Sequence, residues 1–482
     1  MSFLGIDIGT STCKVGILHP DGTLRENAAS IDGAATALSR GEINPYAWWE
    51  ALLTALGNVR DELSQVTAVA VIGNTPTLVL TDEAGQPVRP ALLWNDVRAT
   101  AEAVELLIEA PQPEWTATFG CFVPIAAAYP SAKLRWLQRH EPELLKRTHK
   151  ILQPKDWVNY QLTGVFAGDV WTSKGIVNLA ADAEPLERLG IDVRLAPRCV
   201  RPVDIIGTLR PAVSRTTGLP SGIPVTAGWS DTLGAVISLG LDSDEAFVVS
   251  GTSESIGMLS QAAAVSDAVV TAPVWDTGWT IVHGSTANGT TAVQWAAQLL
   301  GIEETEFYRL AQALPSDAGP LFVPYLQGER SPLWEGSLRG AWLGLGLGTT
   351  RSELARSVLE GIAMAERDVM LAASKATATV PSRVVLTGGG AHNATWNEVR
   401  QAILDRPVVV AESDPVLGAA LLAYLGTTGA DLEDIPEHFL TKRRGIGGTS
   451  GVGFSERGAL YERGKMAVFA YAGKDREFSS PT

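Results

Sequence analysis

Short β-branched runs alternate along the chain with longer segments of helical spacing, which predicts an α/β fold. The clearest short run is Leu4–Leu18, LGIDIGTSTCKVGIL, which predicts a strand, a Gly-Thr-Ser tip and a second strand. The same succession returns at Ala246–Met258, AFVVSGTSESIGM. A hairpin that occurs at the start of the chain and again near its middle indicates two related domains.

Two other predicted strands end in polar residues. Val225–Ala227 is followed by Asp231, which precedes an apolar stretch, Leu233–Leu241, that predicts a helix. Ala68–Ile72 leads into the polar turn Asn74–Thr77. Ligands of open α/β sheets bind beyond the carboxyl ends of the strands, so we expect Asp231 and this turn to lie at one cleft rim.

A third strand, Val384–Thr387, runs into three glycines, Gly388–Gly390, before a helix that contains Trp396 and Val399. Glycine lacks a side chain and lets the backbone approach a ligand closely. A flexible turn is the alternative interpretation. The position between a strand and a helix favours a glycine-rich nucleotide loop.

Periodicity predicts most of the remaining elements. The predicted helices are Tyr46–Leu63, Tyr129–Pro142, a helix that starts at Pro154, Val293–Leu300, Ser352–Ala373 and Val416–Leu425, the last one capped by Asp414-Pro415. The other predicted strands are Leu78–Thr81, a run from Pro90 that ends in Trp94-Asn95-Asp96, a strand pair within Trp275–His283, and Pro320–Tyr325. Gly168-Asp169 is expected in a loop. Beyond Gly429 the periodicity is weak, and we expect no functional element there.

The segment Tyr129–Pro142 has the spacing of an amphipathic helix. Leu134 and Leu137 are expected to face inward, and the basic residues, Lys133, Arg135 and Arg139, to face outward. A solvated helix is therefore the favoured interpretation of this segment.

The length of 482 residues predicts two domains of about 240 residues each, here 1–241 and 242–482. The chain has 38 basic and 53 acidic residues and a net charge of −15, which argues against nucleic acid or an anionic membrane as its partner. Three widely spaced cysteines predict no disulfide framework and fit a reducing cytoplasm. The six histidines lack ligand-like spacing, so we expect no structural zinc. We expect neither a leader peptide nor a membrane span.

A hairpin tip of glycine, threonine and serine can turn backbone N–H groups and hydroxyls toward an anion. A single such tip is usually only a turn. Two tips in one chain, together with Asp7 and Asp231, favour two domains that present matching loops to one shared nucleotide.

In these hairpins and in several further motifs, the chain resembles the FGGY carbohydrate kinases, most closely their xylulokinase-like branch. The two hairpins are similar to the two phosphate hairpins of that family. The other matching motifs, in chain order, are PALLWNDVR, PKDW, PYLQGERSP, GGGAHNATWNEV and DPVLGAALLA. Residues 128–140 fit the first family signature apart from the opening alanine, and residues 340–360 fit the second in full. The resemblance covers nearly the whole chain.

This resemblance implies a two-domain fold of the actin and ribonuclease-H-like ATPase type, with a nucleotide cleft between the domains. The first domain would bind the sugar and supply the base, and the second would bind the nucleotide. Asp231 would be the general base, and Asp7 and Asp231 would hold Mg²⁺. ATP contacts are implied at Gly9, Thr10, Ser11, Lys14, Gly251, Thr252, Ser253, Gln294, Gly389, Gly390 and Asn393. Substrate contacts are implied at Thr75, Pro76, Trp94, Asn95, Asp96, Asp231 and Thr232.

The departures from the family pattern concern the sugar. Xylulokinases usually carry Met-His-Gly at the position of Thr75-Pro76-Thr77, and Asp-Asn at the position of Asp231-Thr232. The loss of an imidazole and an amide alters the polar contacts available to a sugar. A pentulose such as xylulose is the favoured acceptor, and a tetrulose, ribulose or a pentitol is the alternative.

A nucleotide-dependent scaffold of the actin type, without a sugar acceptor, is the alternative from another functional class. Asp231, the Trp94-Asn95-Asp96 run and the two signatures argue against it. A kinase-like fold that has lost activity is disfavoured by the intact Asp7, Asp231 and glycine loops. The sequence does not decide whether the chain forms a homodimer.

Overall fold

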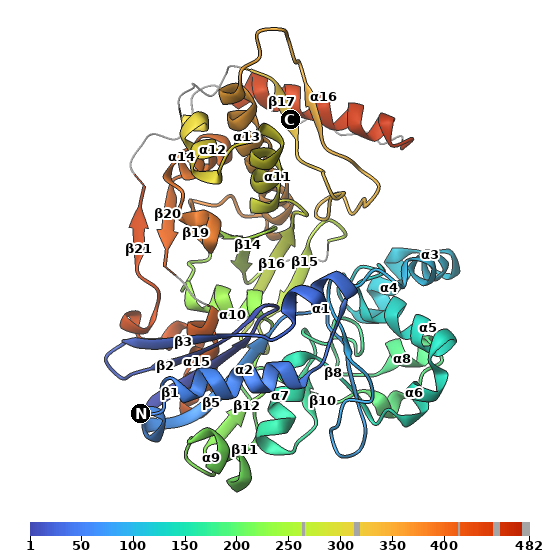
Figure 1. The fold of residues 1–482 in the computed structure, drawn as a ribbon, viewed down its shortest axis with the longest axis vertical. Coiled ribbons are helices and arrows are strands. Elements are labelled where there is room, and N and C mark those ends of the chain that lie inside the picture. Colours follow the sequence, from blue (N-terminus) through green and yellow to red (C-terminus); the bar gives the residue numbers. More distant parts are fainter. Residues whose placement is uncertain (263–265, 313–318, 413–414, 447–453, 475–482) are drawn as a thin grey trace. The chain divides into compact units, whose positions relative to one another are not determined.

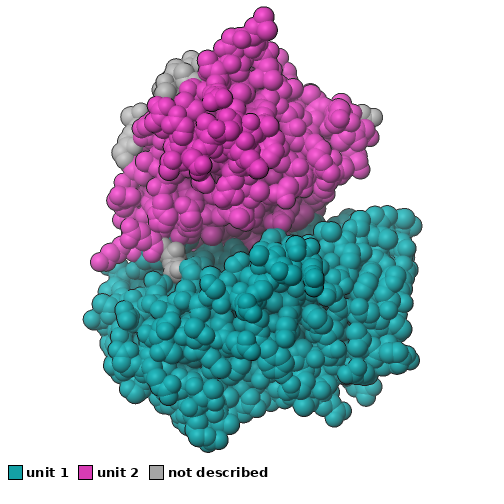
Figure 2. Space-filling view, in the orientation of Figure 1, with its two compact units in different colours: residues 1–240, 275–277, 414–441 teal, residues 241–274, 278–413, 442–482 magenta. Residues whose placement is uncertain are grey.

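The computed structural model describes residues 1–262, 266–312, 319–412, 415–446 and 454–474 (Figure 1). The chain forms two compact units, which Figure 2 colours separately. Unit 1 comprises residues 1–240, 275–277 and 414–441, and unit 2 comprises residues 241–274, 278–413 and 442–482. A single boundary after residue 241 would therefore assign residues 414–441 to the second domain, although they belong to unit 1.

Unit 1 is built on a six-stranded sheet with the order β11-β12-β5-β1-β2-β3. Strands β12, β5 and β1 are parallel, whereas β2, β3 and β11 run antiparallel to their neighbours. The strands are β1 Ser2–Ile8, β2 Thr12–Leu18, β3 Leu24–Ser30, β5 Val66–Gly73, β11 Ile205–Thr208 and β12 Pro224–Thr226. The first predicted hairpin is thus β1 and β2.

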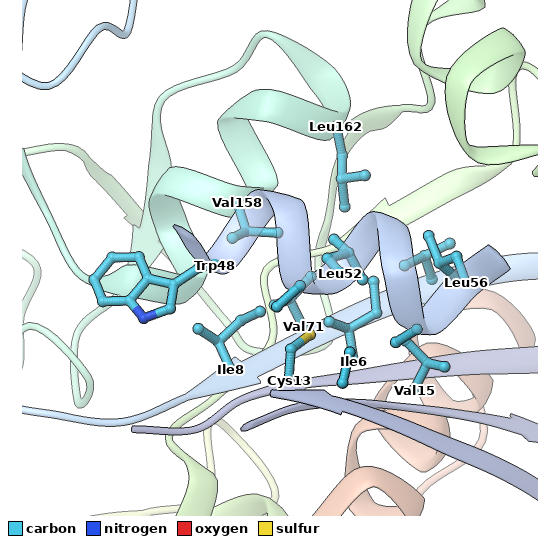
Figure 3. Packing of buried hydrophobic residues seen from close by; sticks show 14 of the residues in the cluster. Ile6, Ile8, Cys13, Val15, Trp48, Leu52, Leu56, Val71, Val158 and Leu162 are labelled. Carbon is cyan, nitrogen blue, oxygen red and sulfur yellow. The ribbon is translucent and has the colours of Figure 1, made fainter. Parts of the chain in front are cut away.

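Helix α2, Tyr46–Gly57, covers one face of this sheet (Figure 3). Trp48, Leu52 and Leu56 on this helix are fully buried and share one core cluster with Ile6 and Val15 of the strands. These three residues lie at i, i+4 and i+8, so the helical period alone places them on one side.

Helix α15, Pro415–Thr428, packs on the opposite face. A Cβ atom at Gly5 would lie 2.1 Å from the carbonyl oxygen of Val416, so only glycine fits at this point of β1. Gly5 alternates with Leu4 and Ile6, which point to the α2 side. The late helix therefore completes the core of unit 1.

The other elements of unit 1 surround this sheet. They are α1 Ala34–Arg40, β4 Glu42–Ile43, β6 Val79–Thr81, β7 Ala91–Leu92, α3 Thr100–Glu109, α4 Gln112–Phe119, α5 Pro130–His140, α6 Pro142–Arg147, β8 Lys150–Leu152, α7 Pro154–Thr163, β9 Ala167–Asp169, α8 Glu184–Arg188, β10 Arg198–Val200, α9 Pro211–Thr217 and α10 Asp231–Ser238.

Unit 2 repeats the scheme with a seven-stranded sheet of order β15-β16-β14-β13-β19-β20-β21. Strands β13, β19 and β20 are parallel, and β13 and β14 form the second predicted hairpin. The series β20-β19-β13-β14-β16 matches β12-β5-β1-β2-β3 of unit 1 in order and in strand direction. The two units are therefore related, as the repeated hairpin predicts.

The elements of unit 2 are β13 Glu245–Ser250, β14 Glu254–Ser260, β15 Val270–Pro273, β16 Thr280–Ser285, α11 Thr290–Leu300, α12 Glu304–Gln312, β17 Leu321–Val323, β18 Ala341–Leu343, α13 Arg351–Thr377, β19 Arg383–Thr387, α14 Ala394–Leu404, β20 Val408–Ala411, β21 Arg443–Gly445 and α16 Phe454–Tyr471. Helix α13 begins with a capping box between Thr350 and Glu353 and packs Val369 and Met370 against the sheet.

Several predicted boundaries are wrong. The helix predicted for Tyr46–Leu63 ends at Gly57, because glycine followed by Asn58 has low helical propensity. Trp275 lies in the turn between β15 and β16, with φ of 36°, and its ring packs 5.6 Å from that of Trp229. Gly168 and Asp169 belong to the short strand β9.

The chain beyond Gly429 is more regular than predicted, because α16, Phe454–Tyr471, adds an 18-residue helix. The predicted cap at Asp414 lies outside the described residues. Cys13, Cys121 and Cys199 are free thiols. In the described part of the chain, no helix has the length and apolar character that a membrane crossing requires.

Candidate active site

Three parallel strands of unit 1 bring the candidate residues to one edge of its sheet. Ile8 of β1 pairs with Gly73 of β5, and Gly73 forms a parallel bridge to Ser230, which follows β12. Asp7 therefore lies two strands away from Asp231, about 10 Å at the usual spacing of strands. The carboxyl ends of the strands form this edge, which is the ligand-binding edge of an open sheet.

Asp231 is the first residue of α10. Its carboxylate is half-buried and accepts the backbone N–H of Thr232 at 2.6 Å. Burial raises the pKa of Asp231, whereas the hydrogen bonds from Thr232 and the positive charge of Lys174 act in the opposite direction. A carboxylate whose pKa is shifted toward neutrality can accept a proton from a hydroxyl group.

The tip of the first hairpin contacts one of the implied substrate residues. The indole Nε1 of Trp94 donates a hydrogen bond to the hydroxyl of Thr10 at 3.0 Å. Ser11 is exposed beside it, and Lys14 lies opposite Asp7 in the ladder of β1 and β2. The structure thus brings the predicted phosphate tip and Trp94 together.

The polar turn after β5 is fixed from two sides. The Thr75 hydroxyl donates to Gln153 Oε1 at 3.3 Å and to the carbonyl oxygen of Thr172 at 3.2 Å. The Thr75–Pro76 peptide bond is cis. The backbone N–H of Thr77 also donates to Gln153 Oε1, at 2.9 Å. Gln153 is therefore a central partner of this turn, and no periodic pattern in the sequence indicates this role.

The predicted outward orientation of Lys133 is wrong. Its side chain is fully buried, and its ammonium group donates to the carbonyl oxygens of Pro76, Leu92 and Leu93 at 3.1, 3.4 and 2.7 Å. Burial lowers the pKa of Lys133 to about 7. Three backbone acceptors replace the water that an ammonium group otherwise needs. Lys133 thus ties the turn after β5 to the segment that precedes Trp94.

Two of the implied substrate residues are engaged in other contacts. Asp96 is buried and pairs with Arg98, with 2.6 Å between Oδ2 and Nε. The Asn95 side-chain amide donates to the carbonyl oxygen of Leu38 at 2.8 Å. These contacts stabilise the loop that carries Trp94, and they support a structural role for Asp96.

A buried ion cluster supports the strand that leads to Asp231. The Lys155 ammonium lies 2.6 Å from Asp156 and 2.9 Å from Asp169, and it donates to the carbonyl oxygen of Ala227 at 3.1 Å. Ala227 immediately follows β12. The PKDW motif is the sequence signal that could have identified this cluster.

The second hairpin tip, in unit 2, is joined to the start of α11. The Gly251 N–H donates to the carbonyl oxygen of Ser253 at 3.1 Å. The Gly251 carbonyl accepts both the backbone N–H and the hydroxyl of Thr290 at 2.9 Å. Thr252 is exposed at the tip, and Gln294 is exposed one turn along α11. The tip is therefore hydrogen-bonded to the start of the helix that carries Gln294.

The glycine loop after β19 packs against the base of this hairpin. A Cβ atom at Gly390 would lie 2.1 Å from the Ser250 hydroxyl, so this position requires glycine. Gly389 is exposed and meets no other atom within 4 Å of an added Cβ atom. Asn393 caps α14, because its side-chain oxygen accepts the backbone N–H of Trp396 at 3.0 Å.

Arg400 connects this loop to the hairpin, a role that the sequence analysis missed. Its guanidinium group donates to Ser250 Oγ at 2.7 Å and to the Gly390 carbonyl at 3.2 Å. It lies 2.8 Å from Glu366 and 3.3 Å from Glu254. Burial raises the pKa of Glu254 and Glu366, and the charge of Arg400 opposes that shift. Arg400 thus joins the base of the second hairpin to the glycine loop.

The carboxylates at this sheet edge are suited to a magnesium ion whose other ligands are phosphate oxygens and water. The described residues contain no group of three or more His, Cys, Asp or Glu side chains that could hold a metal ion. Mg²⁺ is commonly bound by one or two carboxylates together with phosphate oxygens and water. Asp7 and Asp231 at one sheet edge fit that kind of site.

Comparisons with known proteins show which family and which solved structures the chain is similar to. Residues 2–238 match the N-terminal domain of the FGGY family of carbohydrate kinases, and residues 246–426 match its C-terminal domain. A xylulose kinase of Streptomyces coelicolor is 32% identical over 91% of this chain and 91% of its own length. A xylulose kinase of Escherichia coli is 30% identical over 88% and 90%, respectively. The crystal structure of a xyloylose kinase from Brucella ovis superposes with a TM-score of 0.87 at 26% identity, covering 98% of this chain and 100% of that one.

Proposed function

Because the chain belongs to the FGGY family of carbohydrate kinases, we propose that it phosphorylates a terminal hydroxyl of a small sugar, with a pentulose such as xylulose as the first candidate. Membership of the family makes the chain an ATP-dependent carbohydrate kinase with the two-domain actin and ribonuclease-H-like fold. The proposal concerns the acceptor and the roles of individual residues. The xylulose kinases that span most of the chain support the choice of pentulose.

The arrangement of Asp7, Thr75 and Asp231 at one sheet edge carries this proposal. The sugar hydroxyl oxygen forms a bond to the γ-phosphorus atom while the bond from that phosphorus to the ADP oxygen breaks. The hydroxyl proton passes to the Asp231 carboxylate. Such a base contributes about 10² to 10⁴ in rate. Phosphoryl transfer otherwise depends on positioning and on neutralised charge.

Residues of each unit are assigned to the nucleotide. In unit 1, Gly9, Thr10, Ser11 and Lys14 would contact phosphate. In unit 2, Gly251, Thr252 and Ser253 would contact phosphate, and Gln294, Gly389, Gly390 and Asn393 would line the adenosine site. Asp7 and Asp231 would hold Mg²⁺, which when bound neutralises phosphate charge. The free thiols at Cys13, Cys121 and Cys199 support a cytoplasmic location.

The acceptor specificity rests on the polar groups near Thr75. A site whose buried polar groups match a hydroxyl of the substrate rejects analogues that lack it. Here Thr75 and Thr77 are tied to Gln153, and Thr232 lies beside Asp231. These residues replace the imidazole and the amide of the xylulokinase pattern, so tetruloses, ribulose and pentitols stay candidate acceptors.

A coupled assay of ADP release across ketoses and polyols of four to six carbons tests the proposal. We expect MgATP-dependent turnover with at least one of these acceptors and ADP release that depends on its concentration. If the protein binds ATP but its rate of ADP release does not depend on the concentration of any sugar, the result would instead favour the actin-like scaffold.

A further inference from the structure

Lys174 lies in the segment that contacts the Thr75 turn, and it has no acidic partner within ion-pair distance among the described residues. Lys174 is half-buried, and its ammonium group rests 3.9 Å from the centre of the Trp171 ring. In the described part of the chain, no carboxylate lies within ion-pair distance of it. The carboxylate of Asp169 is engaged by Lys155 at 2.9 Å. A positive charge held in a partly desolvated place without a counter-charge is costly.

The backbone adopts an unusual conformation at Lys174. Lys174 has φ of 49°, in the left-handed region, which residues with a side chain rarely adopt. Its segment is tied to the candidate site, because the Thr172 carbonyl accepts the Thr75 hydroxyl at 3.2 Å. Burial lowers the pKa of Lys174 to about 8, and Cys121, Asp169 and Asp231 act in the opposite direction. A pKa of about 8 leaves Lys174 mainly charged at neutral pH.

Hydrogen-bonding groups without a partner lie around the same turn. Gln153 Nε2 and Thr172 Oγ1 are both buried, and neither has a hydrogen-bond partner among the described residues. The Gln153 oxygen accepts from Thr75 and Thr77, which leaves its NH₂ group as a surplus donor. A carboxylate accepts hydrogen bonds at both oxygens and donates none, so it suits a place with an excess of donors.

From this juxtaposition we infer that Lys174 binds a negatively charged group of the acceptor, so that the preferred substrate is a sugar acid of four to six carbons, with a carboxylate at the end opposite the phosphorylated hydroxyl. The inference rests on the proposed kinase function and puts an acidic acceptor ahead of the neutral pentulose that the xylulose kinase relatives favour. Lys174 recognises the substrate and takes no part in proton transfer. The reaction at the hydroxyl is unchanged.

Matched substrate pairs test this inference directly. Each pair differs only in carrying a carboxylate or a hydroxymethyl group at one end: erythronate and erythritol, xylonate and xylitol, gluconate and glucitol. For the wild-type protein we expect at least one acid to exceed its neutral partner about tenfold in kcat/KM. The KM for that acid should rise with added NaCl, whereas the KM for a neutral sugar should not. These measurements need no variant.

Lys174→Met should lower kcat/KM for the acid about 10- to 100-fold and change that for the neutral partner less than threefold. Lys174→Arg should retain part of the preference. Lys146→Met, which removes an exposed lysine of the same unit, is the matched control and should change neither. Thermal unfolding of each variant reports whether it is folded.

The outcomes separate the two proposals. Wild-type turnover of xylulose or of the alditols that exceeds that of the matched acids would overturn the role of Lys174 and leave the kinase proposal intact. An equal loss for acid and neutral substrates in Lys174→Met, or a change confined to the KM for ATP, would also overturn it. Absence of turnover with every member of the panel and with xylulose would overturn both.

Discussion

The buried ammonium group of Lys133 lies 3.1 Å from the carbonyl oxygen of Pro76, so a helix residue 57 positions away holds the turn that carries Thr75. The same ammonium group holds the carbonyls of Leu92 and Leu93, just before Trp94. One side chain therefore fixes two segments to which substrate contacts are assigned.

Lys133→Met should weaken both stability and sugar binding. The substitution removes a buried donor from three carbonyl oxygens. The oxygens of Leu92 and Leu93 keep a backbone N–H donor, whereas that of Pro76 loses its ammonium partner, and we expect the free energy of unfolding to fall by about 1–3 kcal/mol. The KM for the sugar should rise more than the KM for ATP, because the contacts of Lys133 are to the turn at Pro76 and to the Trp94 segment. Urea unfolding and steady-state kinetics measure the two effects.

The control for this prediction is Lys146→Met. Lys146 is exposed, and its ion-pair partner among the described residues is Glu143 on its own helix. Such an exposed pair contributes little to stability. Its loss should change stability by less than about 0.5 kcal/mol. An equal loss of stability in both variants would show that Lys133 has no special role.

Asp231→Asn should abolish most of the phosphotransfer and spare nucleotide binding. The amide keeps an oxygen that can accept the Thr232 N–H, so the start of α10 is retained. It cannot take the hydroxyl proton, and kcat should fall about 10²- to 10⁴-fold. Calorimetric titration with ATP in the absence of Mg²⁺ should give an unchanged affinity, because the assigned contacts of Asp231 are to Mg²⁺ and to the acceptor and not to the nucleotide. Asp21→Asn, in an exposed turn of the same unit, should be fully active; substantial turnover by Asp231→Asn would remove the proposed base.

The features that the sequence predicted are local. The Gly-Thr-Ser tips, the strand that precedes Asp231 and the glycine loop after β19 each depend on neighbouring residues, and the structure has them where the pattern placed them. Helix α13 likewise follows from a long proline-free helical run. Periods of two and 3.6 residues are visible in sequence without tertiary information.

The features that the sequence missed depend on distant contacts. Lys133 has the spacing of an outward residue, but three carbonyl oxygens from other segments receive its charge. Arg400 lies on α14, yet its main partners are Glu366 and Ser250, far away in the chain. Helical spacing cannot show such partners, because they come from elements that meet only in the folded chain. The same reason applies to Gln153.

Glu329 should make stability depend on pH in a definite direction. Its Oε1 atom accepts the backbone N–H groups of Ala287 and Arg330 at 2.6 and 2.8 Å, while Oε2 is buried without a hydrogen-bond partner in the described residues. Burial raises the pKa of Glu329 from 4.5 to about 8, with the hydrogen bonds acting in the opposite direction. The folded state therefore retains a proton that the unfolded state releases. The contribution is complete below about pH 4.5 and is lost as the pH rises through about 8.

Glu329→Gln isolates this contribution, because the amide stays neutral and keeps the acceptor for both N–H groups. The stability of the variant relative to the wild type should increase by about 2 kcal/mol from pH 6 to pH 8. Urea unfolding at the two pH values measures the difference. Glu306→Gln, at an exposed position where a hydrogen bond from Arg309 lowers the pKa, should show no such increase. A constant offset between Glu329→Gln and the wild type would exclude the proposed protonation.

The glycine loop of unit 2 offers two adjacent positions with opposite expectations. At Gly390 an added Cβ atom would lie 2.1 Å from the Ser250 hydroxyl, which itself accepts from Arg400 at 2.7 Å. Gly390→Ala must therefore displace Ser250 or the loop, and we expect a loss of about 1–3 kcal/mol in stability. At Gly389 an added Cβ atom meets nothing within 4 Å, so Gly389→Ala should unfold like the wild type.

The same pair of variants distinguishes a structural from a nucleotide-binding role for the loop. If the adenosine group lies against Gly389, the methyl group of Gly389→Ala occupies space that the ligand needs, and the KM for ATP should rise several-fold at unchanged stability. Gly390→Ala should also raise the KM for ATP. In addition it should lower the midpoint of unfolding, because it disturbs the Ser250–Arg400 contact. An unchanged KM for ATP in Gly389→Ala would place the nucleotide away from this glycine and leave the loop with a packing role alone.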